Sequence, residues 1–110
     1  MAWDAESLSK SYQWQAKDAE RYLGTLKEKI KHNKSYERIY DEHLARFWVY
    51  NHLQGRTFLG SKDALLRELE AMRSTPQTVP NGSYDPDRFK RFFDTCLEKV
   101  IQDVTAMAAN

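Results

Sequence analysis

One histidine lies in the middle of an apolar helical stripe, where a haem or metal ligand would point into a helical core. His43 stands between Tyr40 and Phe47 at the spacing of successive helix turns. A lone histidine on such a face is more often held by a tyrosine or a backbone carbonyl than by a metal. His52 is too distant to share a metal on the same face, and the paired Glu-x-x-His motifs of di-iron bundles do not occur. We therefore expect no metal and no cofactor.

Short catalytic motifs are also missing from the sequence. It contains no G-x-S-x-G, no H-E-x-x-H, no phosphate-binding P-loop and no Rossmann glycine pattern. Apart from Asp103, near the edge of an apolar stripe, the acidic residues fall mainly on polar helix faces, where solubility and pairing with basic residues explain them. We expect a protein without enzymatic activity.

Basic residues gather in two places along the chain. The first group surrounds the junction of the first two predicted helices and comprises Lys27, Lys29, Lys31, His32, Lys34 and Arg38. Such a group can bind the phosphates of a nucleic acid or an acidic protein patch, but the negative end of a helix dipole also attracts cations. The second group, in the first turns of the last predicted helix, comprises Arg88, Lys90 and Arg91. The dipole opposes positive charge there, which favours the binding interpretation.

Tryptophan provides the strongest indication of a partner. Trp14 falls about 160° to 200° from the apolar stripe of its helix, and Trp3, if helical, shares that outer face with Arg21. Tryptophan is seldom left exposed, and Trp and Arg are enriched in interface hot spots. The alternative is that another helix or a loop covers Trp14. Trp48 and Val49 extend the apolar surface of a helix that is apolar nearly all round. The predicted partner-binding residues are Trp3, Trp14, Arg21, Trp48 and Val49.

These residues are carried by four predicted amphipathic helices, over residues 5–31, 36–54, 62–73 and 86–107. Most glycines and all prolines fall at the junctions. The predicted N-caps are Asp4, Asn33 or Ser35, Ser61, and Asp85 followed by Pro86. Gly55 is the predicted residue after the second helix, and a long loop precedes the fourth.

Each predicted helix has one apolar stripe that needs a partner. In the first helix the stripe is Leu8, Tyr12, Ala16, Ala19, Leu23, Leu26 and Ile30; in the second it is Ile39, Tyr40, His43, Leu44, Phe47 and Tyr50. The third has Leu65, Leu66, Leu69 and Met72, and the fourth has Phe89, Phe92, Phe93, Cys96, Leu97, Val100, Val104 and Met107. No strict period-2 alternation is present. An all-α, antiparallel four-helix bundle is predicted.

Composition sets the limits of these interpretations. The 110 residues predict one domain over 1–110, and the single cysteine, Cys96, predicts no internal disulfide. A net charge of +1 gives no global field for nucleic acid. Without an apolar leader or a membrane-spanning run, we expect a cytoplasmic protein with no membrane partner.

The leading functional hypothesis is a small protein-interaction module, an accessory subunit, adaptor or inhibitor, that docks on a larger protein or on a second copy of itself to form an oligomer. Nucleic-acid binding through the basic junction is the first alternative. The second alternative is a ligand pocket inside the bundle, lined by Tyr40, His43, Phe47, Phe92 and Phe93.

Overall fold

Four α-helices make up the fold in the computed structural model, which describes residues 2–54, 61–75 and 79–108. They are α1 (Ala5–Ile30), α2 (Tyr36–Leu53), α3 (Lys62–Ser74) and α4 (Pro86–Thr105). The all-α prediction is confirmed, and every helix end lies within two residues of the position predicted from the sequence. None of these helices is long and apolar enough to cross a membrane.

Local capping explains where three of the helices begin. Asp4 accepts hydrogen bonds from the backbone N–H groups of Glu6 and Ser7, and Asp85 accepts from those of Asp87 and Arg88. Ser61 caps α3 through the N–H of Ala64. Each cap satisfies N–H groups that have no partner within the helix.

The start of α2 differs from this pattern. Ser35 occupies the N-cap position without a side-chain cap bond, and its N–H instead donates to Oδ1 of Asn33 at 3.0 Å. The predicted role of Gly55 lies outside the described residues.

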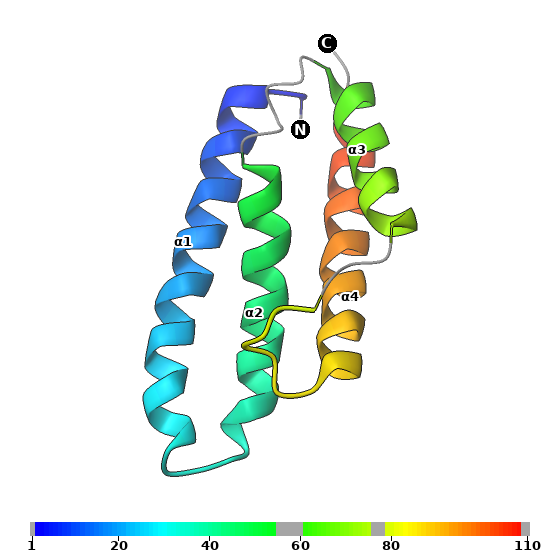
Figure 1. Cartoon of the computed structure of the whole chain (residues 1–110). Helices are drawn as coiled ribbons and strands as arrows, with labels where there is room; N and C mark the ends of the chain where they lie inside the picture. Colours follow the sequence, from blue (N-terminus) through cyan, green and yellow to red (C-terminus); the bar gives the residue numbers. More distant parts are fainter. Residues whose placement is uncertain (1, 55–60, 76–78, 109–110) are drawn as a thin grey trace.

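The helices pack in the order α1, α2, α4, α3, which differs from their order in the chain. Figure 1 shows α1 and α2 as a hairpin, with α4 running beside α2 in the same direction and the shorter α3 lying on α4. No Cα of α1 comes within 8 Å of a Cα of α4. Because α2 lies between these two long helices, α1 and α4 do not contact each other across the side of α2 that faces the space between them.

The core follows the predicted stripes in α1, α3 and α4 more closely than in α2. In α2, Ile39 is 40% exposed and His43 and Phe47 are half-buried, so the predicted stripe is wrong at Ile39. Ala45, Val49 and Leu53 are fully buried instead. This helix packs against α1 on one side and α4 on another, and therefore buries two faces rather than one stripe.

The first and the last residues that the structure describes lie together at one end of the molecule. The N–H of Trp3 donates to the carbonyl of Ala108 at 2.7 Å, and Ala2 and Ala108 form an isolated parallel bridge. Nζ of Lys62 donates to the carbonyl of Thr105, the last residue of α4, and to that of Met107 just beyond it. These bonds satisfy carbonyls at the end of α4 and tie the start of α1 and of α3 to it.

Candidate functional site

The residues predicted to form one outer face are divided by the structure. Trp14 is 61% exposed, and Arg21 is exposed and paired with Asp18. Trp3 is only 8% exposed, so its predicted place on this face is wrong: it precedes α1 and packs into the core instead of following the helical wheel. Val49 is fully buried between helices, which removes it from any surface. Trp48 is 46% exposed.

A groove of about 820 Å³ lies between α1 and α4, at the place where these helices do not reach each other. The α1 wall comes from Asp4, Ser7, Leu8, Ser11, Tyr12 and Gln15, preceded by Ala2. The opposite wall comes from Lys99, Val100, Asp103, Ala106 and Met107, and Tyr50 of α2 lies between the walls. This volume falls in the range of ligand-binding clefts in proteins, about 300 to 1,000 Å³.

Two tyrosines form the centre of this groove. The rings of Tyr12 and Tyr50 are 5.4 Å apart, and both residues are buried. Burial raises the pKa of Tyr50 to about 12. Burial also raises the pKa of Tyr12, whose hydroxyl has no hydrogen-bond partner among the described residues. Tyr12 is therefore a neutral polar group lining the groove that an occupant could satisfy.

Trp14 lies beside this groove on the surface of α1. Ser11 and Ser7, which line the groove, stand three and seven residues before Trp14. Residues at these spacings are neighbours on one helix face. Trp14 does not itself line the groove, but its exposed indole stands next to these two lining residues on α1.

His43 is held by its neighbours on α1 and α2. Its ring stacks on Tyr22 with centroids 4.7 Å apart, and Nη1 of Arg46 lies 3.3 Å from its Nδ1. Burial and the nearby Arg46 lower the pKa of His43, so the imidazole is neutral at pH 7. Arg46 also donates to Gln15 and to Asp18, which lies 2.8 Å away across the helix pair. The polar cluster therefore joins α1 to α2.

The residues of the predicted pocket around His43 lie in different surroundings. Tyr40 and Phe93 are buried in the core, whereas Phe92 faces a separate pocket near the start of α4. His43 itself is stacked on Tyr22.

The predicted basic cluster is spread over an exposed junction. Lys31 pairs with Glu28, and Nζ of Lys29 lies 5.4 Å from the centre of the Tyr36 ring. Lys27, His32 and Lys34 are exposed. Arg38 instead lines a pocket with Arg88 and Arg91, so the structure joins one member of the first basic group to two members of the second.

Asp41, which no sequence pattern distinguishes, is the buried polar side chain that joins α2 to the start of α4. Asp41 is fully buried and accepts hydrogen bonds from the N–H groups of Tyr84 and Asp85, each at 3.0 Å. It also accepts from the Ser83 hydroxyl and from Nε and Nη2 of Arg88. These bonds hold the loop before α4 and the first turn of α4 against α2, and they fix Arg88 at the pocket.

Cys96 is expected to react slowly with thiol reagents at neutral pH. Burial raises its pKa to about 11, above the 9.0 of an ordinary thiol, so very little thiolate is present at pH 7. Because the unfolded chain loses this proton near pH 9 and the folded chain near pH 11, the free energy of unfolding falls as pH rises through this range. The rates at which a thiol reagent labels Cys96 in the native and in the denatured protein measure the difference in reactivity. Equal rates at pH 7 would contradict it.

No protein-family model, curated protein or solved structure matches the chain.

Proposed function

We propose that this chain is a protein-interaction module that binds an amphipathic helix of a partner protein in the groove between α1 and α4. The observation that carries the proposal is the separation of α1 and α4 on either side of α2, with a groove between them. A helix lying there packs against three helices and extends the bundle.

The dimensions and lining of the groove fit a helix. The lining runs along α1 from Asp4 to Gln15, about 17 Å at 1.5 Å per residue, which accommodates about three turns of a partner helix. Apolar side chains for its apolar face come from Leu8, Val100 and Met107. Recognition of an amphipathic helix in an apolar groove is a common mode of peptide binding.

Charge determines the kind of helix expected. Asp4 and Asp103 line the groove with Lys99 as the one cation, so its formal charge is −1. Within the described residues, neither Asp103 nor Lys99 forms an ion pair. Hydrogen bonds from Ser7 lower the pKa of Asp4 and keep its carboxylate ionised. A helix with basic residues beside its apolar stripe complements this lining better than an acidic one.

Loss of Trp14 is expected to weaken such binding without unfolding the protein. The probe is a labelled peptide of about 18 residues, composed of leucine, alanine and lysine with leucines on one helical stripe. Fluorescence polarisation should give an affinity for Trp14→Ala about tenfold below that of the unmodified protein, since tryptophans at interfaces contribute strongly.

Trp48→Ala is the matched control, because Trp48 is also an exposed tryptophan, but no residue that lines the groove stands three, four or seven positions from it. Its affinity should change by less than about twofold. Equal losses in the two variants would show general adhesion to exposed indoles and would contradict the groove. Sedimentation of the chain alone tests the other occupant: a dimer abolished by Trp14→Ala would identify a second copy instead of a partner helix.

A further inference from the structure

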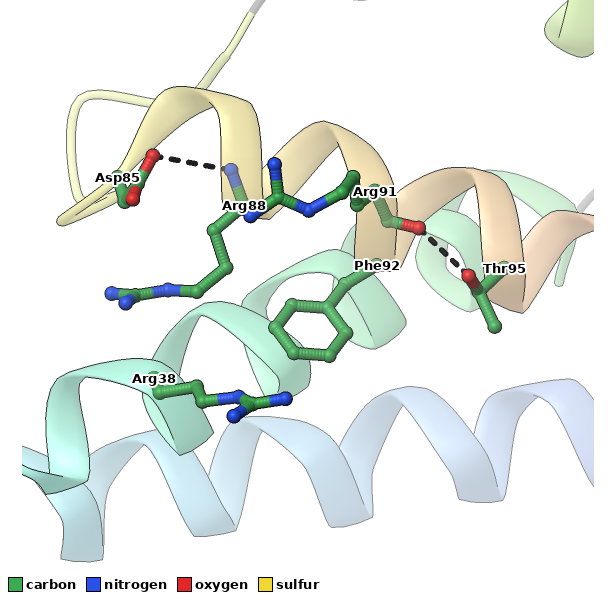
Figure 2. A pocket seen from close by; sticks show the side chains of 6 residues that line it. All are labelled: Arg38, Asp85, Arg88, Arg91, Phe92 and Thr95. Atoms are coloured by element: carbon green, nitrogen blue, oxygen red, sulfur yellow. Dashed lines mark hydrogen bonds between the residues drawn. The ribbon is translucent and has the colours of Figure 1, made fainter.

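A second pocket lies on a different part of the surface, between α2 and the beginning of α4. Its volume is about 410 Å³, and it shares no lining residue with the groove. Figure 2 shows Arg38 reaching it from α2, while the other labelled side chains come from α4 and the residue before it. The lining comprises Arg38, Asp85, Arg88, Arg91, Phe92 and Thr95.

Positive charge dominates this pocket. Its lining carries three arginines and one carboxylate. The Arg88 guanidinium is paired with Asp41, and the Asp85 carboxylate is already engaged by the N–H groups of Asp87 and Arg88. Within the part of the chain that the structure describes, the guanidinium groups of Arg38 and Arg91 have no hydrogen-bond acceptor or ion-pair partner. Placing like charges around one pocket is unfavourable unless an anion neutralises them.

One arginine is held in place by a buried carboxylate. Asp41 accepts hydrogen bonds from Nε and Nη2 of Arg88 at 3.1 and 3.0 Å. Nη1 of Arg88 keeps its N–H donors, because no described residue accepts from it. Since Asp41 fixes the side chain before any ligand arrives, part of the entropic cost of ordering a binding arginine is already met in the folded protein.

We propose that this pocket binds the phosphoryl group of a small phosphate monoester. Guanidinium groups form paired, charge-assisted hydrogen bonds with phosphate oxygens, and Arg38 and Arg91 supply unused donors for them. In Figure 2 the Arg38 guanidinium lies toward the ring of Phe92. That half-buried ring provides an apolar surface for the group that carries the phosphate.

A small ligand fits this pocket better than a nucleic-acid duplex. Of the six basic residues at the junction of α1 and α2, only Arg38 lines the pocket. Lys31 is paired with Glu28 and Lys29 lies over Tyr36, so the basic residues do not form one continuous track. Strong duplex binding needs many phosphate contacts along such a track.

The test uses inorganic phosphate, adenosine monophosphate and glucose 6-phosphate as probes, titrated into the full chain at constant ionic strength. The side-chain Nε–H signals of arginine in NMR spectra report binding directly. We expect the Arg38 and Arg91 signals to shift with all three probes, at dissociation constants in the millimolar range or below. Tighter binding of adenosine monophosphate than of glucose 6-phosphate would identify Phe92 as a stacking surface. Equal affinities would identify the phosphoryl group as the only part of the ligand that determines affinity. Both results support phosphate-monoester binding.

The double variant Arg38→Gln/Arg91→Gln should bind phosphate at least about tenfold more weakly. Lys90→Gln is the matched control, since Lys90 lies on the same turns of α4, is exposed and does not line the pocket. Its affinity should stay within about twofold of the original. Unchanged binding by the double variant, or an equal loss in Lys90→Gln, would overturn the proposal. A short DNA duplex that displaces adenosine monophosphate, in a manner that depends on Lys90, would also overturn it by identifying a nucleic-acid surface.

Discussion

Replacing Asp41 with alanine is expected to lower the free energy of unfolding by about 3 to 5 kcal/mol, the range measured when one partner of a buried ion pair is removed. Asp41 is fully buried, and the side chain of its partner Arg88 is only 23% exposed. The substitution leaves the N–H groups of Tyr84 and Asp85 without their acceptor, in addition to the guanidinium of Arg88. Urea denaturation followed by circular dichroism measures the loss.

Two further variants separate the contributions of Asp41. Asp94→Ala, at an exposed position of α4, should change the free energy of unfolding by less than about 0.5 kcal/mol. A double-mutant cycle of Asp41→Ala and Arg88→Ala isolates the energy of the ion pair. When Asp41 is replaced in a protein that already lacks Arg88, the backbone hydrogen bonds to Asp41 are lost but no ion pair is broken. If Asp41→Ala lowered the free energy of unfolding no more than Asp94→Ala does, the hydrogen bonds by which Asp41 joins α2 to the loop before α4 would not form in solution.

Replacing Trp3 by alanine is expected to lower the free energy of unfolding much more than replacing Trp14 by alanine. Trp3 is buried in the core cluster, so Trp3→Ala should cost about 3 to 5 kcal/mol, typical of truncating a buried aromatic side chain. Trp14 is 61% exposed, and Trp14→Ala should change stability by less than about 0.5 kcal/mol. Thermal unfolding of the two variants, compared with the unmodified protein, measures the difference.

The opposite order of stabilities would reverse the assignment of these tryptophans. If Trp14→Ala unfolded the protein while Trp3→Ala did not, Trp14 would belong to the core and could not contact a partner at the surface. Trp3→Phe provides a second measurement when Trp3→Ala fails to fold, because it keeps an aromatic ring in the core and should cost less than the alanine substitution.

Helix positions were predictable because their signals are local. Asp4, Ser61 and Asp85 cap helices through N–H groups no more than three residues away, and Pro86 fits the first turn without losing a hydrogen bond. A capping residue followed by an apolar stripe therefore identifies a helix from a short stretch of sequence.

Features that depend on distant residues were not predictable in this way. Asp41 meets Arg88 across 47 positions of the chain, and no local pattern distinguishes it from a solvent-exposed acid. Trp3 was placed on a helical wheel, but it precedes α1 and bonds to Ala108 near the other end of the chain. Both errors come from tertiary contacts that override local periodicity.

The candidate sites depend on the packing order of the helices, which amphipathic stripes do not determine. The helical pattern places Trp14 outside the apolar stripe and leaves open whether it is exposed or covered, whereas the groove beside it arises because α2 lies between α1 and α4. Likewise, both basic groups were visible in the sequence, whereas the pocket that joins Arg38 to Arg88 and Arg91 needs the contact of α2 with α4.

Charge reversal in the groove tests the proposed function most directly. The measurement compares the affinities of two peptides with the same leucine stripe, one carrying lysines and the other glutamates, for the unmodified protein and for Asp103→Lys. Asp103 is exposed and unpaired within the described residues, so this substitution should leave the fold intact. We predict that the unmodified protein prefers the lysine peptide and that Asp103→Lys shifts the ratio of affinities toward the glutamate peptide by about tenfold or more. An unchanged ratio would contradict binding of a basic helix between α1 and α4.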